Sequence, residues 1–178
     1  LHQVSAGYGK HQVLQDLSVA FEQGNITGII GVNGSGKSTL LKTILGMVPN
    51  TWGGVTVEGK PIREMTRNEI ARKIAYLSQE KATPDMTVEQ LVLHGRFPHL
   101  SYPRRYSAKD REIAAYAMEQ TGVSQYAKKA LQTLSGGMRQ RAYIAMALAQ
   151  DTDYVFLDEP TTHLDIAHQL ELMKLLRV

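Results

Sequence analysis

Residues 31–38 read Gly-Val-Asn-Gly-Ser-Gly-Lys-Ser and fit the pattern G-x-x-x-x-G-K-[ST]. An apolar run at 26–30 precedes them and a helical pattern at 39–45 follows, which predicts a strand, a glycine loop and a helix. Glycines let backbone N–H groups approach phosphate oxygens, and the helix adds the positive end of its dipole. We predict that Lys37 contacts the β- and γ-phosphates of a nucleotide and that Ser38 binds Mg²⁺. An accidental match in a glycine-rich turn is the alternative, which the flanking patterns disfavour.

Two adjacent carboxylates follow an apolar run near the end of the sequence. Residues 154–157 are Tyr-Val-Phe-Leu, typical of a fully buried parallel strand, and Asp158 and Glu159 come next. Ligands bind at the carboxyl ends of the strands in open α/β sheets. We predict that Asp158 holds Mg²⁺ through water and that Glu159 orients and polarises the water that attacks the γ-phosphate. Two acids at the start of a surface loop would be the favoured interpretation if the glycine loop were absent.

A second candidate anion site lies at 134–137, where Leu-Ser-Gly-Gly directly precedes a helix whose residues 143–149 are almost all apolar. Ser135 is a favourable N-cap residue, and the first N–H groups of a helix can bind an anion. By itself this segment is more often an ordinary cap and turn, so its significance depends on its order among the other motifs.

The composition is that of one soluble domain. The 178 residues fit a single domain with a hydrophobic core and carry 20 Lys and Arg against 17 Asp and Glu. The basic residues are scattered, so charge does not suggest a nucleic-acid partner. There is no cysteine for a disulfide or a thiolate metal site, and no apolar run approaches the roughly 20 residues of a membrane-spanning helix. The sequence starts without Met and stops within a helical pattern at 166–177, so we expect truncation at both ends.

The remaining patterns predict an α/β protein with a helical insertion. Strand patterns occur at 13–21, 26–30 and 55–58. A helical pattern at 67–73 leads into a strand at 73–79, which Gln79 closes. From 80 to 134 the strand patterns disappear, and residues 87–90 and 107–110 resemble helix capping boxes. Residues 80–134 are therefore predicted to be a helical insert.

The motifs at 31–38, 79, 134–137 and 158–159, in this order, resemble the nucleotide-binding domain of ABC transporters over almost the whole sequence. The resemblance implies an α/β P-loop NTPase (ABC ATPase) core with a parallel sheet, an N-terminal antiparallel β part and an all-helical insert at 80–134, in a single domain spanning 1–178. It also implies that ATP and Mg²⁺ bind between two copies arranged head to tail. Residues 135–137 of one copy would complete the γ-phosphate site that residues 31–39 form in the other.

The same resemblance implies roles for individual residues. Tyr8 matches the aromatic residue that stacks on adenine, although an ordinary loop tyrosine is the alternative. Gln79 matches the glutamine that senses Mg²⁺ and links the ATP site to the helical insert. The implied catalytic residues are Glu159, Lys37 and Gln79. The residues implied to contact ATP are Tyr8, Asn33, Gly34, Ser35, Gly36, Lys37, Ser38, Thr39, Ser135, Gly136 and Gly137, and those implied to bind Mg²⁺ are Ser38, Gln79 and Asp158.

Two features depart from the family pattern. Met138 stands where the family usually has Gln or Glu, which is tolerable because Ser135 and the backbone make the phosphate contact. The loop at 162–165 matches the loop that couples the two sites through its aspartate, but the sequence ends before the family's switch histidine. His163 and His168 are in the wrong place to substitute for it. We therefore expect residues 1–178 alone to bind nucleotide but to hydrolyse it poorly.

Residues 87–99, 149–152 and 162–169 are similar to segments of importers for iron-siderophore complexes, haem and cobalamin. The implied function is that of an ATP-hydrolysing motor subunit for iron-chelate uptake, peripheral to the cytoplasmic face of the cell membrane. Its implied partners are integral membrane permease subunits, a second copy of itself and, indirectly, a substrate-binding protein, with no nucleic acid.

The end of a helix in this segment is a candidate contact with a partner surface. Gly95 and Pro98 are predicted to end the helix and to leave Arg96, Phe97 and His99 available to a partner surface. A plain helix terminus with a solvated arginine is the alternative.

Other function classes explain the sequence less well. An importer of haem, cobalamin or a metal is the nearest alternative. A soluble ABC-type ATPase that acts on DNA or ribosomes would predict tandem domains, coiled-coil insertions or basic tracts, and this sequence has none of them. A P-loop kinase or GTPase would leave residues 134–137 unexplained.

Overall fold

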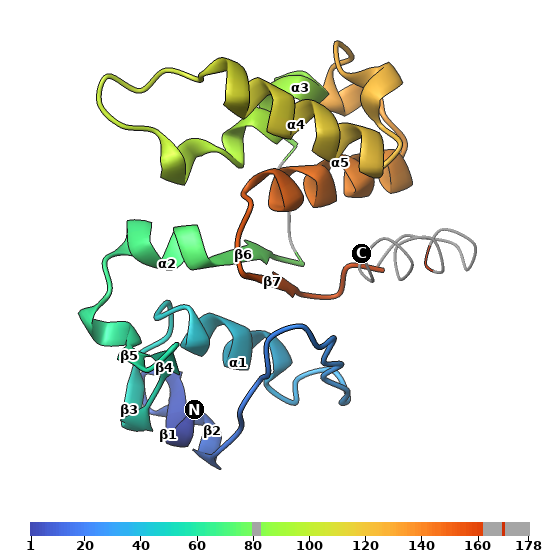
Figure 1. The fold of residues 1–178 in the computed structure, drawn as a ribbon. Helices are drawn as coiled ribbons and strands as arrows, with labels where there is room; N and C mark the ends of the chain where they lie inside the picture. Colours follow the sequence, from blue (N-terminus) through green and yellow to red (C-terminus); the bar gives the residue numbers. More distant parts are fainter. Residues whose placement is uncertain (80–82, 162–168, 170–178) are drawn as a thin grey trace. The chain divides into compact units, whose positions relative to one another are not determined.

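Two compact units make up the computed structural model, which describes residues 1–79, 83–161 and 169 (Figure 1). The first unit is Leu1–Ile74 and the second is Ala75–Val178. The loop at 162–165 and His168 lie outside the described residues, as does most of the helical pattern at 166–177.

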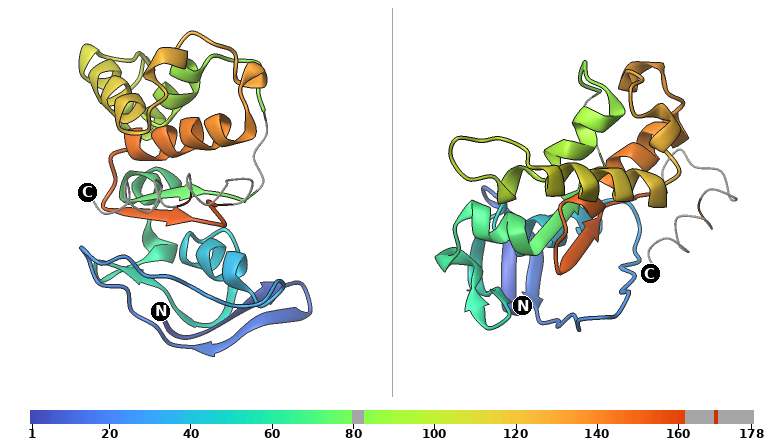
Figure 2. Two further views of the ribbon diagram at one scale, coloured as in Figure 1. Left: turned by 90° about the vertical axis from the view of Figure 1, so that its right-hand side faces the viewer. Right: turned by 45° about the horizontal axis from the view of Figure 1, so that its top comes forward.

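A three-stranded antiparallel sheet and one helix form the core of the first unit. Strand β1 (His2–Tyr8) pairs with β2 (His11–Leu17) on one side and with β3 (Asn50–Gly54) on the other. Helix α1 (Lys37–Ile44) packs against β1 and β2 (Figure 2). Its leucine and isoleucine side chains are buried. This sheet confirms the predicted N-terminal antiparallel part.

A short hairpin replaces the strand predicted at 55–58. Strand β4 (Thr56–Val57) pairs with β5 (Lys60–Pro61), and the two residues between them, Glu58 and Gly59, have φ angles of 50° and 81°. Positive φ at both turn positions matches the twist of a tight hairpin. The observed strand is thus shorter than predicted at both ends, because Val55 precedes β4 and Glu58 belongs to the turn.

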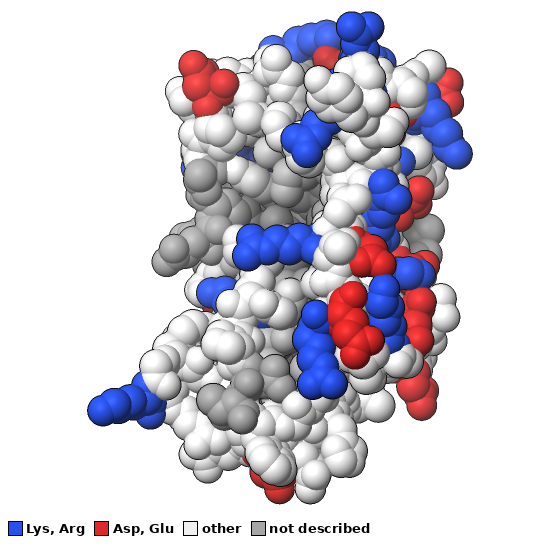
Figure 3. Space-filling model, turned by 90° about the vertical axis from the view of Figure 1, so that its left-hand side faces the viewer, with Lys and Arg blue, Asp and Glu red and all other residues white. Residues whose placement is uncertain are grey.

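Ion pairs connect this hairpin to the helix that follows it. The 3-10 helix η1 (Ile62–Glu64) leads into α2 (Arg67–Lys73). Lys60 Nζ lies 2.8 Å from a carboxylate oxygen of Glu69, within the first turn of α2. Figure 3 shows Lys and Arg side chains beside Asp and Glu side chains on one face of the molecule. Opposite charges therefore offset one another locally on this face.

The apolar run at 26–30 is not a strand in the structure. Residues 18–36 contain neither helix nor strand, and Ile30 is 98% exposed. A strand requires a neighbouring strand to complete its ladder of hydrogen bonds. Among the described residues, this run belongs to none of the sheets. The predicted strand before the glycine loop is therefore wrong, and irregular backbone leads into the loop.

A pair of parallel strands runs beneath the helices of the second unit. Strands β6 (Ile74–Leu77) and β7 (Tyr154–Leu157) are neighbours in one sheet and run in the same direction (Figure 1). The prediction of full burial for 154–157 is wrong, since Val155 is 37% exposed and the other three residues are half-buried. Apolar residue types indicate a strand, but the elements that cover it decide how much of it is buried.

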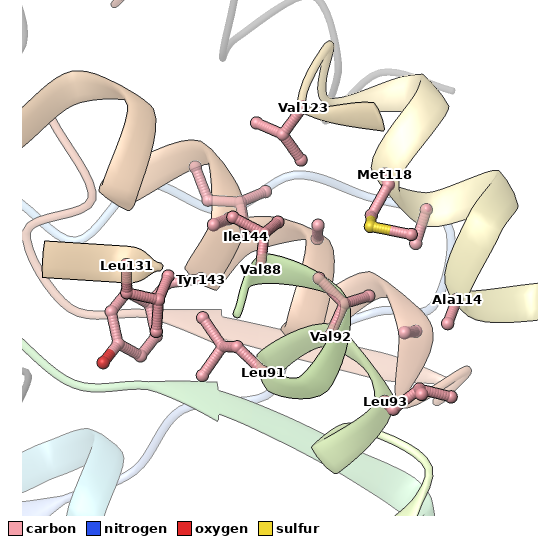
Figure 4. Close-up of a cluster of buried hydrophobic side chains, with 14 of the residues drawn as sticks. Val88, Leu91, Val92, Leu93, Ala114, Met118, Val123, Leu131, Tyr143 and Ile144 are labelled. Carbon is pink, nitrogen blue, oxygen red and sulfur yellow. The ribbon is translucent and has the colours of Figure 1, made fainter. Parts of the chain in front are cut away.

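Among the described residues of the second unit, three α-helices enclose the hydrophobic core. They are α3 (Val88–His94), α4 (Ala108–Gln120) and α5 (Gly136–Ala149). Figure 4 shows their apolar side chains meeting in one cluster, with Val92 of α3 and Ile144 of α5 among them. The 3-10 helices that connect them are η2 (Phe97–His99), η3 (Ser124–Tyr126) and η4 (Leu131–Thr133). In the part of the chain that the structure describes, no helix is long and apolar enough to span a bilayer.

The ends of these helices confirm several local predictions. Thr87 and Ser107 are the N-cap residues of α3 and α4, and each forms the predicted capping box. Gly95 follows α3 as predicted, but for a different reason. Its φ is −56°, outside the left-handed region typical of glycine at a helix end. A Cβ on Gly95 would lie 2.2 Å from the backbone oxygen of Met146, so this glycine permits the close approach of α3 to α5.

Arg96 is buried and does not present its charge to a partner. Its side chain is 7% exposed, and Nε donates a hydrogen bond to Asp110 at 3.0 Å while Nη1 donates to the last carbonyl of α5. The ring Nε2 of His99 lies 2.8 Å from the carbonyl oxygen of Gln150. The prediction that Arg96 faces a partner is wrong, because its side chain is buried against Asp110 and the C-terminal end of α5. His99 is half-buried, so its availability to a partner stays a prediction. Of the three predicted residues, only Phe97 is exposed, at 45%.

This buried ion pair predicts a loss of stability when its carboxylate is neutralised. The pKa of Asp110 is lowered to about 2, chiefly by the hydrogen bond from the Ser107 hydroxyl and further by the Ser107 backbone N–H and the Arg96 guanidinium. In Asp110→Asn, Arg96 keeps a buried charge, and its remaining carboxylate partner is the largely exposed Asp151, 3.8 Å from Nη1. We expect the free energy of unfolding at pH 7 to fall by about 3 kcal/mol. Urea unfolding followed by circular dichroism measures the change, with Glu112→Gln, an exposed carboxylate on the same helix, as control.

The stability difference between the parent and Asp110→Asn should depend on pH in one direction. A carboxylate whose pKa is about 4 in the unfolded chain and about 2 in the folded protein contributes its full stabilisation above about pH 4. That contribution is lost as the pH falls from about 4 towards 2, so the two unfolding free energies should converge there. A constant difference over this range would show that the charge of Asp110 is not responsible.

Candidate functional site

The glycine loop before α1 has a backbone that depends on glycine. Gly34 and Gly36 have φ angles of 81° and 95°, in the left-handed region that side chains disfavour. A Cβ on Gly36 would lie 2.9 Å from Cγ1 of Val13, and a Cβ on Gly31 would lie 2.6 Å from Oγ of Ser35. A side chain would therefore strain the backbone at Gly34 and Gly36, and at Gly31 and Gly36 it would force Ser35 or Val13 to shift, as expected of a loop whose backbone N–H groups approach a ligand.

Lys37 is the first residue of α1 and closes the loop. Its ammonium donates hydrogen bonds to the carbonyl oxygens of Gly31 at 2.8 Å and of Val32 at 3.0 Å. These bonds hold the cation at the N-terminus of α1, whose first turn contains no acidic residue. An ammonium group has three N–H donors. The two carbonyl contacts therefore leave a third donor for a phosphate oxygen.

The other residues of the first unit that the sequence assigns to ATP lie in the same loop, in the same helix and at the end of β1. Asn33 is exposed in the loop, and Ser38 and Thr39 belong to the first turn of α1. Tyr8 is the last residue of β1 and is 51% exposed, so its ring is accessible for stacking. The contacts of these residues with ATP stay predictions.

Asp158 lies directly after β7, at the carboxyl ends of the two parallel strands. The residue is 5% exposed, and its Oδ2 accepts a hydrogen bond from the Tyr76 hydroxyl at 3.2 Å. Its backbone N–H donates to the carbonyl oxygen of Leu77 at 2.9 Å. Hydrogen bonds of this kind fix the orientation of a carboxylate, as they do for carboxylates that ligate metals. Contact of Asp158 with Mg²⁺ stays a prediction.

Gln79 and Glu159 are in contact. The Nε2 of Gln79 donates to Oε2 of Glu159 at 2.6 Å, which joins two residues 80 positions apart in the sequence. Glu159 has a φ of 48°, a left-handed conformation that is uncommon for a residue with a Cβ and that recurs at functional sites. The amide assigned to Mg²⁺ sensing and the carboxylate assigned to water activation thus form one hydrogen-bonded pair.

Ser135 is the N-cap of α5, as its position in the sequence predicts. Its Oγ accepts a hydrogen bond from the N–H of Met138 at 3.3 Å, and Gly136 and Gly137 are the first two residues of the helix. Met138 is half-buried and packs against the hydrophobic core of the second unit, so an apolar residue is accommodated at this position. Contact of this helix start with a phosphate stays a prediction.

Two further residues at this site, Tyr76 and Gln140, are not apparent from the sequence. Tyr76 binds Asp158, and Gln140, on α5, donates from Nε2 to the backbone carbonyl of Pro160 at 2.6 Å. The two contacts join residues 82 and 20 positions apart. No local pattern marks either residue, because its partner lies in another segment.

The α/β fold, the glycine loop before α1 and the acidic pair after β7 define a P-loop nucleotide-binding domain. Residues 14–162 match the ABC transporter family, and the chain belongs to that family. Among solved structures, a metal-chelate type ABC transporter in an inward-facing conformation is 31% identical, with a TM-score of 0.81 over 98% of this chain and 66% of that chain. An ATP-binding cassette of an ABC transporter in its ADP conformation is 25% identical, with a TM-score of 0.86 over 99% of this chain and 74% of that chain.

Relatives similar in sequence to this chain are named as import or transport ATP-binding proteins. The iron(3+)-hydroxamate import ATP-binding protein FhuC of Bacillus subtilis (strain 168) is 47% identical over 98% of this chain and 65% of its own length. The ferric enterobactin transport ATP-binding protein FepC of Escherichia coli (strain K12) is 46% identical over the same shares. The petrobactin import ATP-binding protein YclP of Bacillus subtilis (strain 168) is 40% identical over 98% of this chain and 69% of its own length. The chain thus spans 65% of the length of the first two relatives.

Proposed function

We propose that this chain belongs to the ATP-hydrolysing motor subunit of an ABC importer for iron chelates. The observation that carries the proposal is the 2.6 Å hydrogen bond between Gln79 and Glu159 beyond the carboxyl ends of β6 and β7. It supports an active site at this edge of the sheet, where an amide orients a carboxylate suited to proton transfer. Sequence identity of 46 to 47% to ATP-binding proteins named for iron(3+)-hydroxamate import and ferric enterobactin transport supports the substrate class.

The loop at 31–39 would bind the phosphates of ATP. A Cβ at Gly31 or Gly36 would lie within 3 Å of a side-chain atom of Ser35 or Val13, and the loop's lysine is already held at the helix N-terminus by two carbonyl groups. Lys37 would donate its third N–H to the β- or γ-phosphate. Tyr8, exposed at the end of β1, would stack on adenine.

Mg²⁺ would take protein ligands from Ser38, Gln79 and Asp158. This ion prefers oxygen ligands and is usually held by one or two carboxylates together with substrate phosphates and water. The hydroxyl, amide and carboxylate oxygens of the three residues fit that preference, and Tyr76 orients the buried carboxylate of Asp158. When bound, the ion would offset the negative charge of the phosphates. Glu159 would accept a proton from the attacking water in an orientation that Gln79 helps to fix.

The complete subunit would act as a dimer on a membrane permease. Residues 135–137 of a second copy would contact the γ-phosphate, so ATP would bridge the two copies and closure of the dimer would drive the permease. The subunit would lie on the cytoplasmic face of the membrane, and a substrate-binding protein would deliver the ferric chelate to the permease. Importers of haem, cobalamin or a metal are the nearest alternatives, and an ATPase that acts on nucleic acid or ribosomes is the least supported.

Reconstitution of the full-length protein with the permease encoded by neighbouring genes tests this function. We expect the protein to co-purify with a polytopic membrane protein, and ATP hydrolysis in proteoliposomes to increase when a binding protein loaded with a ferric siderophore is added. The same binding protein without ligand is the control. Stimulation by haem or cobalamin alone would replace the iron-chelate substrate with one of the alternatives. Co-purification with nucleic acid and with no membrane protein would contradict the transport function.

A further inference from the structure

Gln140 connects α5 to the backbone immediately after Glu159. The residue is 6% exposed, and its Nε2 donates a hydrogen bond to the carbonyl oxygen of Pro160 at 2.6 Å. Proline has no backbone N–H, so the carbonyl is the backbone group through which hydrogen bonding can hold this residue. The contact therefore restrains the chain one position beyond Glu159.

The backbone of Glu159 needs support from its neighbours. Its φ of 48° is disfavoured for a residue with a Cβ. Such a conformation persists only where the surrounding structure holds it. Before Glu159, the N–H of Asp158 donates to the carbonyl of Leu77 at 2.9 Å. After it, Gln140 holds Pro160, so the strained residue lies between two restrained ones.

We propose that Gln140 is a positioning residue for Glu159. Gln140 keeps Glu159 in the left-handed conformation in which the carboxylate of Glu159 contacts Gln79. The inference rests on the proposed function, because the catalytic role of Glu159 is part of that proposal. Helix α5 begins next to Ser135, so Gln140 would also connect the predicted phosphate-contacting helix start to the predicted water-activating carboxylate. A displacement of α5 would reach Glu159 through this hydrogen bond.

Amide hydrogen exchange of the full-length protein tests the positioning without any catalytic measurement. Gln140→Met keeps the approximate length of the side chain and removes the donor, whereas Gln140→Asn keeps the amide on a chain one methylene shorter. We expect both variants to exchange faster than the parent in the peptide that contains residues 158–161, as measured by mass spectrometry. Thr121→Val is the matched control, because it removes a buried hydroxyl bonded to the carbonyl of Ala117 at 3.0 Å. This control should leave the peptide unchanged.

ATP hydrolysis tests the consequence for catalysis. We expect Gln140→Met to lower kcat by about tenfold or more and to change KM for ATP by less than about twofold, because misplacing a catalytic group affects the chemical step more than binding. Adding Gln140→Met to Glu159→Gln should cause no further loss of kcat, because Gln140 acts through the carboxylate that is already gone. A purely structural role would lower kcat to the same extent in both backgrounds.

The outcomes separate this inference from the proposed function. Parental exchange at residues 158–161 in both Gln140 variants would overturn the inference, and so would an unchanged kcat in Gln140→Met or an additive loss in the double variant. If the unmutated full-length protein hydrolysed no ATP, the proposed function would fail instead. The exchange experiment would then still decide whether Gln140 holds the chain at Glu159.

Discussion

Glu159→Gln should lower kcat for ATP hydrolysis by the full-length protein by about 10²- to 10⁴-fold, the usual contribution of a general base. Glutamine keeps the shape of the side chain and can still accept the hydrogen bond that Gln79 donates at 2.6 Å. It has no charge with which to take a proton from the attacking water. Because the glycine loop and Lys37 are unchanged, ATP should still bind, and an ATP-bridged dimer should accumulate. Phosphate release measures the rate, and light scattering after size-exclusion chromatography with ATP measures the dimer.

Glu119→Gln is the matched control for this experiment. This substitution also removes one carboxylate, that of an exposed residue near the end of α4. The variant should hydrolyse ATP at the parental rate. Parental turnover by Glu159→Gln would show that Glu159 is not the catalytic base. A loss of turnover without any ATP-dependent dimer would leave the base assigned and contradict the head-to-tail arrangement.

Lys37→Ala should weaken MgATP binding to the full-length protein by about ten- to a hundredfold. A charge-assisted hydrogen bond contributes roughly 1.5–3 kcal/mol, which corresponds to that range of affinity. The substitution also removes the two bonds by which the ammonium holds the carbonyl groups of Gly31 and Val32. The loop would therefore lose both a cation for the phosphates and part of its own closure. Isothermal titration calorimetry with MgATP measures the dissociation constant.

Lys42→Ala provides the comparison within the same helix. Lys42 lies in the last turn of α1, at the opposite end from the loop, and its replacement should leave the affinity close to the parental value. Equal weakening in the two variants would indicate a general disturbance of α1. Unchanged affinity in Lys37→Ala would remove the assignment of this loop to phosphate binding.

The sequence by itself determines the features whose interacting partners lie a few residues apart. Thr87 and Ser107 form the predicted capping boxes, and Ser135 caps α5. Helix α1 begins at Lys37, as the motif at 31–38 predicts. In each case the residues that form the cap or turn and the backbone N–H groups at the start of the helix belong to the same short segment. The order of these segments was also sufficient to predict the ABC transporter family, which the match of residues 14–162 confirms.

The tertiary structure decides the features whose partners lie in other segments. The run at 26–30 has the residue types of a strand, yet a strand also needs a neighbour to complete its hydrogen bonds. Arg96 has the residue type of a solvated cation, yet Asp110 and the end of α5 neutralise and bury it. The contact between Gln79 and Glu159, 80 positions apart, has no local signal at all. Residue type limits what a side chain can bind, but only the folded chain brings a distant counter-ion, strand or donor within reach of it.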